Sequence, residues 1–301
     1  RALLTPRGLL VMATAAEAEH IEALAAEGRA NGASLERIEG NDLPARVPIL
    51  RPGLFDSGLL EPEAMDMDVA ALHQGFLRGL RQAGGAVVNH AEAERIEREG
   101  DRWRITTRQG AVYAAPTLVN AAGAWADGVA EQAGVAPLGL VAKRRTGIML
   151  DLPAGTDPAG WPLTGDLGES FYFKPDAARL MLSPADATPT APQDAQPEIE
   201  DVARVVERFM EVTTVEVERP GETWAGLRSF VPDGEPVAGY APGAEGFFWL
   251  VGQGGYGIQT AVGMGRASCA LVQGEQLPAD MTELGLAAGQ LAPDRASLTQ
   301  S

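Results

Sequence analysis

The stretch Phe247-Phe-Trp-Leu-Val-Gly-Gln-Gly-Gly-Tyr-Gly-Ile-Gln-Thr260 joins an apolar run, a glycine loop and the beginning of a helical pattern. The apolar run stops at Gly252, and a helix of small residues is expected from about Ile258. Glycines permit positive φ and let a backbone come close to a ligand. The unpaired N–H groups at the start of the helix favour an anion. The stretch is therefore either a ligand-binding turn or an ordinary strand-to-helix turn.

Two further segments favour the ligand-binding interpretation. Leu118-Val-Asn-Ala-Ala-Gly-Ala-Trp-Ala-Asp127 has the same order of strand, small-residue turn and helix. Thr223-Trp-Ala-Gly-Leu-Arg-Ser-Phe-Val-Pro-Asp233 places Arg228 just before a Pro-Asp turn. Small residues leave room for close approach of the backbone to a bound group.

The composition excludes several classes of protein. The formal net charge of −17 over 301 residues argues against nucleic acid or an anionic membrane as a partner. An anionic substrate would need positive charge supplied locally by its site. Cys269 is the single cysteine, which excludes a disulfide framework, and its apolar helical setting predicts a buried structural thiol. The three histidines lack metal-ligand spacing, and no apolar run is long enough to span a membrane.

Hydrophobic periodicity predicts alternating strands and helices, which is typical of an α/β or α+β fold. Thr14–Glu17 matches a capping box for a helix ending at Gly28, and Asp68 is expected to cap a second helix. Val202–Phe209 marks a third helix. We expect strands at 8–13, 86–89, 103–106, 111–113, 118–120, 141–150, 170–174, 180–183 and 213–218.

The motifs occur in an order that resembles the D-amino-acid-oxidase-like flavoproteins, among them glycine oxidase, sarcosine oxidase and the D-amino acid dehydrogenases. The segments Asp68–Gly79, Ala142–Arg145 and Glu169–Asp176 extend the resemblance over nearly the whole chain, and they are most similar to the bacterial D-arginine dehydrogenase type. The resemblance implies an FAD-dependent oxidoreductase with interleaved FAD-binding and antiparallel-sheet substrate domains. The expected divisions are 1–60 (substrate), 61–138 (FAD), 139–224 (substrate), 225–290 (FAD) and 291–301 (disordered tail).

The family begins with a βαβ unit whose G-x-G-x-x-G turn holds the pyrophosphate at a helix N-terminus. We find no βαβ unit carrying that fingerprint in this chain, which starts at Arg1. The fold is therefore expected to be N-terminally incomplete. An alternative interpretation is a non-catalytic fragment without tight cofactor binding.

The resemblance implies FAD as the cofactor and oxidative deamination of D-amino acids to 2-oxo acids and ammonia, by hydride transfer from Cα to flavin N5. A glycine- or sarcosine-type secondary amine oxidase is the alternative enzyme. The partners implied are a small amino acid and an electron acceptor that is a quinone, a carrier or oxygen. The expected location is the cytoplasm or the periphery of the inner membrane.

By resemblance, Arg145 and Arg228 grip the substrate carboxylate with charge-assisted hydrogen bonds. Strand alternation places Arg145 and Lys143 on one face and Arg144 on the other, so only one of these faces can look into a site. The alternative interpretation is a solvated basic triplet at Arg145 and a surface ion pair at Arg228.

Tyr172 is expected to line the substrate pocket and offer its hydroxyl, although a tyrosine in a strand also packs. Leu9 stands where the D-arginine-preferring relatives carry a glutamate. A leucine cannot pair a cation, so we expect a side chain not restricted to cationic ones, unless Leu9 merely packs in its strand. The substrate-binding residues implied are Leu9, Leu163, Glu169, Gly226, Gly255 and Gln259.

The resemblance also assigns the cofactor contacts. Backbone N–H groups at Ile258–Thr260 are expected to donate to the flavin, which is electrostatic stabilisation of its reduced anion. The cofactor-binding residues implied are Ala121, Ala122, Gly123, Trp125, Gly226, Gly254, Gly255, Tyr256, Gly257, Ile258, Gln259 and Thr260, and no metal ligand is expected.

Overall fold

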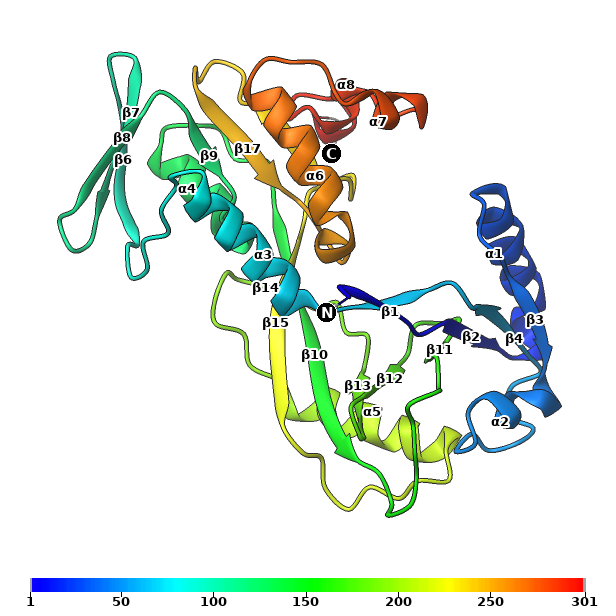
Figure 1. The fold of residues 1–301 in the computed structure, drawn as a ribbon. Coiled ribbons are helices and arrows are strands. Elements are labelled where there is room, and N and C mark those ends of the chain that lie inside the picture. Colours follow the sequence, from blue (N-terminus) through cyan, green and yellow to red (C-terminus); the bar gives the residue numbers. More distant parts are fainter. Residues whose placement is uncertain (1, 300–301) are drawn as a thin grey trace. The chain divides into compact units, whose positions relative to one another are not determined.

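The computed structural model describes residues 2–299 and confirms the expected mixed α/β fold (Figure 1). The chain forms two compact units. Unit 1 comprises Arg1–Gly79, Arg144–Thr188 and Ala195–Gly226, and unit 2 comprises Leu80–Lys143, Pro189–Asp194 and Leu227–Ser301. The chain therefore passes between the units several times. Which unit binds FAD stays a prediction.

Unit 1 is built on a mixed sheet in which β2 and β11 are parallel and the other neighbours are antiparallel. The strands, in spatial order, are β10 (Val141–Asp151), β13 (Arg179–Ser183), β12 (Tyr172–Asp176), β11 (Leu163–Asp166), β2 (Leu9–Ala13), β4 (Ser57–Glu61) and β3 (Glu36–Glu39). Strand β15 (Thr223–Phe230) also pairs with β10, and the first residues of β10 pair with β14 (Pro189–Thr190).

One face of this sheet carries the core of unit 1. Residues that pair across strands share a face, so Leu182, Phe173 and Leu10 lie together with Ile148. Helix α5 (Ile199–Val212) packs on this core face through Phe209, whose ring meets Phe173 edge to face at 5.4 Å. The residues that alternate with these along each strand, such as Tyr172 and Ser183, lie on the opposite face of the sheet.

The predicted N-terminal helix follows a short 3-10 turn, η1 (Ala15–Glu17), as α1 (Ala18–Ala30). The Thr14 N–H donates to Glu17 Oε2 at 2.9 Å, which confirms the helix start, but the helix runs two residues beyond Gly28. The rest of unit 1 consists of β1 (Leu4–Pro6) paired with β5 (Met65–Met67), η2 (Gly40–Asp42) and α2 (Leu43–Arg46).

Helix α3 (Val69–Gln82) connects unit 1 to unit 2 and begins where predicted, because Asp68 Oδ1 accepts the Ala71 N–H at 3.0 Å. Val69, Phe76 and Leu80 recur at helical spacing on α3, and all three are exposed. The amphipathic pattern therefore identifies the helix without identifying what packs on it.

Unit 2 contains two three-stranded sheets within its described residues, and buried residues of both sheets meet in one core, where the Trp103 and Phe247 rings lie 5.6 Å apart. The first is β16 (Val237–Tyr240), β17 (Phe247–Val251) and β9 (Leu118–Asn120), flanked by η3 (Gly123–Trp125), α4 (Ala126–Gln132) and α6 (Gly257–Val272). The second is β6 (Ala93–Glu99), β7 (Arg102–Thr107) and β8 (Val112–Ala115), in which the strands expected at 103–106 and 111–113 pair as a hairpin through Gly110.

Three expectations are wrong. Residues 86–89 form no strand, and Val87 and Val88 are exposed, because no strand of the described residues pairs with them. Residues 213–218 make only an isolated bridge, Leu50 to Thr213, so their alternating pattern reflects packing without a ladder. Cys269 is exposed on α6 rather than buried.

The C-terminal part also differs from the expected disordered tail, 291–301. Helices α7 (Ala279–Glu283), α8 (Ala288–Leu291) and α9 (Ala296–Thr299) are present there or just before it. Arg295 donates to both Asp233 carboxylate oxygens, at 2.7 and 2.8 Å, and this pair is largely buried. Residues 300–301 lie outside the described residues.

Arg295→Met should destabilise the protein by about 3 kcal/mol, because it leaves the Asp233 carboxylate partly buried without its cation. Hydrogen bonds from Arg295 hold the pKa of Asp233 well below its usual range. The pair therefore stabilises the fold above the unfolded aspartate pKa of about 3.9, and that stabilisation is lost as the pH falls below it. Urea denaturation at pH 7 and pH 3 measures both effects; an equal loss at the two pH values would contradict the assignment.

Candidate functional site

The glycine loop of unit 2 connects β17 to α6 as predicted. Gly252 and Gly254 have φ of +73° and +54°, which favour glycine, and the Gly254 N–H donates to the Ser229 carbonyl at 2.9 Å. This hydrogen bond ties the loop to the end of β15.

Two side chains press on the loop at Gly254 and Gly255, and the rigid Phe230 ring together with the positive φ makes glycine necessary at Gly254. A Cβ at Gly254 would lie 2.8 Å from Phe230 Cε1, and a Cβ at Gly255 would lie 2.8 Å from Arg228 Nη1. The Arg228 guanidinium therefore rests on the loop backbone. The structure thus brings together Arg228, Gly254 and Gly255, three of the residues expected at the site.

The helix N-terminus offers fewer donors than expected. The Thr260 N–H already donates to the Tyr256 carbonyl at 3.0 Å, as does the Thr260 hydroxyl at 2.8 Å. Both donors of Thr260 thus have an acceptor within the helix, and the expected role of Thr260 at a cofactor site stays a prediction. The N–H groups of Gly257, Ile258 and Gln259 precede the first intrahelical hydrogen bond and point out of the helix. Tyr256, Ile258 and Gln259 are exposed.

The second turn, after β9, is organised by a residue that sequence analysis missed. Asn120 is buried; its Nδ2 donates to the Ala126 carbonyl at 2.8 Å, and its Oδ1 accepts the Ala122 N–H at 3.3 Å. Gly123 has φ of +57°, and a Cβ there would meet no atom within 4 Å. Ala121 and Trp125 are exposed beside it. The sequence did carry a signal for this role, because Asn120 is a polar residue at the end of an apolar strand.

The two turns lie at the same edge of one sheet. Strands β9 and β17 are parallel neighbours, with Asn120 opposite Trp249, so their carboxyl ends point the same way. Ligands of open α/β sheets bind outside the carboxyl ends of the strands. The glycines of the 252–257 loop also have G-x-G-x-x-G spacing, but no strand follows α6 in the described residues, so this is not a βαβ unit.

In unit 1, the residues expected to bind substrate gather on the face opposite α5. Leu9 pairs with Leu163, and Tyr172 pairs with Gly165 and Ser183. Ser183 adjoins Leu182, the partner of Ile148, so alternation along β10 places Arg145 on the same face as Tyr172. Four predicted residues from four strands therefore share one surface.

Arg145 and Tyr172 are in contact on that surface. The Arg145 guanidinium lies 5.9 Å from the Tyr172 ring centroid, and Arg145 Nε is buried with no hydrogen-bond partner among the described residues. Gly226 has no atom within 4 Å of a Cβ built there, and Trp224, two residues before it, packs over Gly147. Glu169, which is expected to bind substrate, is exposed in a turn with φ of +50°.

Leu9 lines a hollow of about 110 Å³ formed with residues of α1, β2, β4 and the loop after α1. Leu24, Leu35 and Leu59 make it apolar, and Glu61, directly opposite Leu9 on β4, supplies its carboxylate. Packing of Leu9 in its strand is thus part of its role. Glu61 was not singled out from the sequence because its pairing partner is distant in the chain.

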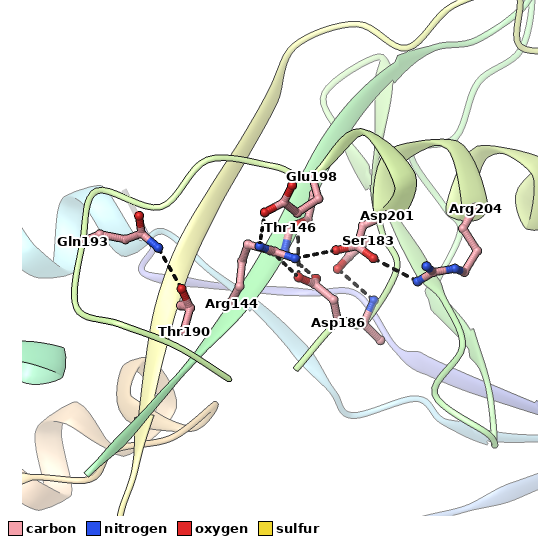
Figure 2. A network of polar contacts seen from close by, with 10 residues as sticks. Arg144, Thr146, Ser183, Asp186, Thr190, Gln193, Glu198, Asp201 and Arg204 are labelled. Carbon is pink, nitrogen blue, oxygen red and sulfur yellow. Dashed lines mark hydrogen bonds and ion pairs between the residues drawn. The ribbon is translucent and has the colours of Figure 1, made fainter. Parts of the chain in front are cut away.

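Strand alternation places Arg144 on the face of β10 opposite Arg145, and Figure 2 shows Arg144 enclosed by carboxylates. Its Nη1 donates to Glu198 at 2.7 Å and its Nη2 to Asp201 at 2.9 Å, and Asp186 lies 3.5 Å from its Nε. Asp186 also accepts the Thr146 N–H at 2.6 Å. Although burial alone lowers the Arg144 pKa, these carboxylates raise it overall.

A second ionic cluster lies on the face that carries Tyr172. Lys174 Nζ donates to Asp66 Oδ1 at 2.9 Å, and Arg7 Nε donates to Asp66 Oδ2 at 2.7 Å. Burial raises the Asp66 pKa, but the bonds from Lys174 and Arg7 outweigh it and lower the pKa overall. Lys174 is therefore neutralised locally.

Within residues 2–299, no cluster of His, Cys, Asp and Glu has metal-binding geometry, and no helix is both long and apolar enough to cross a membrane.

Comparison with known proteins gives one family. The family model described as DAO, FAD dependent oxidoreductase, matches residues 2–271. Glycine oxidase of Bacillus licheniformis is 23% identical over 252 residues, which cover 83% of this chain and 66% of that protein. Mitochondrial sarcosine dehydrogenase of Homo sapiens is 23% identical over 276 residues, covering 86% and 30%. The chain thus spans two thirds or less of these relatives' length.

Solved structures show the same fold. Glycine oxidase from Geobacillus kaustophilus superposes with a TM-score of 0.79 at 21% identity, covering 91% of this chain and 72% of that one. Iminodiacetate oxidase from Chelativorans sp. BNC1 gives 0.78 at 21% identity, covering 91% and 74%. The wider family resemblance is confirmed, whereas the D-arginine dehydrogenase type stays a prediction.

The unfolding free energies of Arg144→Met and Arg145→Met should differ, because Arg144 stabilises the fold whereas Arg145 is expected to bind a ligand. Removing Arg144 leaves buried carboxylates unpaired and should cost about 3 kcal/mol or more in unfolding free energy. Removing Arg145, which makes no ion pair with a described residue, should change the unfolding free energy by less than about 1 kcal/mol. Urea denaturation followed by tryptophan fluorescence measures both. Equal losses would show that the two faces of β10 are not distinct in role.

Proposed function

Because the chain belongs to the DAO family of FAD dependent oxidoreductases, we propose that it oxidises the C–N bond of an amino acid amine. The observation that carries the proposal is the pair of small-residue turns at the carboxyl ends of the parallel strands β9 and β17. Such an edge is where a parallel sheet presents its ligand.

The residues present fit a flavin. Gly123 leaves the β9 turn unobstructed, since a Cβ there would meet no atom within 4 Å. The glycine loop presents exposed backbone, and the N–H groups of Gly257–Gln259 supply donors at a positive helix end. Residues 121–123 and Trp125 would hold the cofactor at one turn and residues 254–259 at the other. FAD, when bound, supplies acceptance of the two electrons that leave the substrate.

In this proposal Arg145 and Arg228 bind the substrate carboxylate and thereby fix the orientation of Cα–H. The buried, unpartnered Arg145 Nε supports this role, because a carboxylate would satisfy it. Tyr172 offers its hydroxyl beside Arg145. The substrate amine enters without its extra proton; loss of two electrons and two protons gives an imine, and water converts it to a 2-oxo acid and ammonia.

The substrate we propose is a D-amino acid whose side chain is not restricted to cationic ones. Leu9 and Leu163 give the shared face of unit 1 an apolar strip, and Lys174 on that face is already paired with Asp66. The only carboxylate lining the Leu9 hollow is that of Glu61. An apolar or mixed side chain suits this surface better than a guanidinium.

Oxidation of a secondary amine is the second candidate. It is favoured by the names of the relatives, since glycine oxidase, sarcosine dehydrogenase and iminodiacetate oxidase are all similar to this chain. A small secondary amine would use the same arginines and the same turns.

A substrate panel decides between these candidates. The FAD-loaded protein, expressed from its complete reading frame, should oxidise apolar D-amino acids with kcat/KM at least about tenfold above that for the matching L-enantiomers, sarcosine and glycine. Turnover of D-arginine and D-lysine alone would contradict the interpretation of Leu9. Preference for sarcosine or glycine would establish the second candidate.

Arg145→Met and Arg228→Met should each lower kcat/KM by about ten- to a hundredfold, because each removes one charge-assisted contact worth about 1.5–3 kcal/mol. The loss should appear with carboxylate substrates and be smaller with the corresponding amine that lacks a carboxylate. Near wild-type kcat/KM for both variants would rule out the arginine anchors.

A further inference from the structure

The ring of Phe230 is flanked by two cations. Lys143 Nζ lies 4.7 Å from the ring centroid and Arg228 Cζ lies 5.5 Å from it. The same ring presses on Gly254, and Arg228 presses on Gly255. All five residues belong to unit 2, so the glycine loop, the ring and both cations form one local cluster. Cations over an aromatic face are attracted by the ring quadrupole.

Lys143 makes no ion pair with any described residue. It is half-buried, although the protein carries a net charge of −17 and offers many surface carboxylates. An exposed lysine would keep its rotamer freedom and a hydrated ammonium. Lys143 instead places a positive charge, which no described carboxylate neutralises, over the ring that contacts the glycine loop.

We propose that Lys143 is a second anion-binding residue of unit 2, acting with Arg228 on the negative charge that a bound ligand brings to the glycine loop. The chemistry it recognises is a planar, delocalised anion. Two sources fit: the substrate carboxylate, and the pyrimidine edge of the reduced flavin. The inference rests on the proposed function. Phe230 is the positioning residue, because the ammonium lies over the ring that contacts Gly254.

The test compares three variants in the FAD-loaded protein expressed from its complete reading frame. Lys143→Met removes the charge and keeps the stem, and Lys143→Arg keeps the charge. Arg266→Met is the matched control, because Arg266 on α6 forms a solvent-exposed pair with Asp280 of α7 and its replacement also removes one positive charge from unit 2. Two quantities are measured: the dissociation constant of benzoate, from the change in flavin absorbance, and the midpoint potential of the flavin without benzoate.

Lys143→Met should weaken benzoate binding by about five- to tenfold or lower the midpoint potential, while Arg266→Met leaves both within twofold or unchanged. Lys143→Arg should restore most of the loss. A change in the benzoate constant alone identifies the substrate carboxylate as the anion, and a change in the potential alone identifies the reduced flavin. If Lys143→Met matches Arg266→Met in both measurements, the inference is overturned.

Phe230→Leu tests the positioning. If the ammonium acts from its place over the ring, Phe230→Leu should reproduce part of the loss, and Lys143→Met/Phe230→Leu should be no worse than the stronger single variant. Losses that multiply would show that the two residues act independently and would overturn the positioning role.

The outcome for the wild type separates the two proposals. A wild-type protein that binds no flavin refutes the proposed function, and the inference with it. A wild-type protein that oxidises amines while Lys143→Met is indistinguishable from the control refutes the inference alone.

Discussion

The neutralisation of Arg144 is the constraint on which the arrangement of unit 1 depends. A buried guanidinium is costly unless carboxylates surround it, so Glu198 and Asp201 from α5 and Asp186 from the preceding loop are all drawn to one point on β10. Asp186 holds β10 again through the Thr146 N–H. Because side chains alternate along a strand, fixing Arg144 toward the core also fixes Arg145 on the face that carries Tyr172.

In unit 2, the corresponding constraint is steric. The backbone at Gly254 is contacted by the Phe230 ring at a distance that leaves no room for a Cβ, and the Arg228 guanidinium rests on the backbone at Gly255. A side chain at either position would push the ring or the guanidinium away from the loop. The same contacts that require glycine therefore hold the positive groups at the start of α6, where the helix dipole already favours an anion. The contacts that shape the loop backbone therefore also position the Arg228 guanidinium.

The sequence predicts those elements whose signals are local. Strand β17 with its glycine loop and the turn after β9 follow from residues adjacent in the chain, and both are confirmed. The strand expected at 86–89 is absent because a strand also needs a partner, which periodicity does not report. Glu61 and Asn120 were missed for a related reason: their roles depend on what pairing and folding bring beside them. The roles of Arg145, Arg228 and Tyr172 rest on family resemblance and stay predictions.

The distribution of cations explains how an acidic protein can present positive charge to a small anion. With 24 lysines and arginines against 41 acidic residues, most cations have carboxylates within reach. Arg144, Arg295 and Lys174 form ion pairs with neighbouring carboxylates, so their positive charges are balanced locally. Arg145 and Lys143 instead rest on aromatic rings, which attract a cation without cancelling its charge. An aromatic partner thus keeps a guanidinium or ammonium ordered and still available, which an ion pair does not.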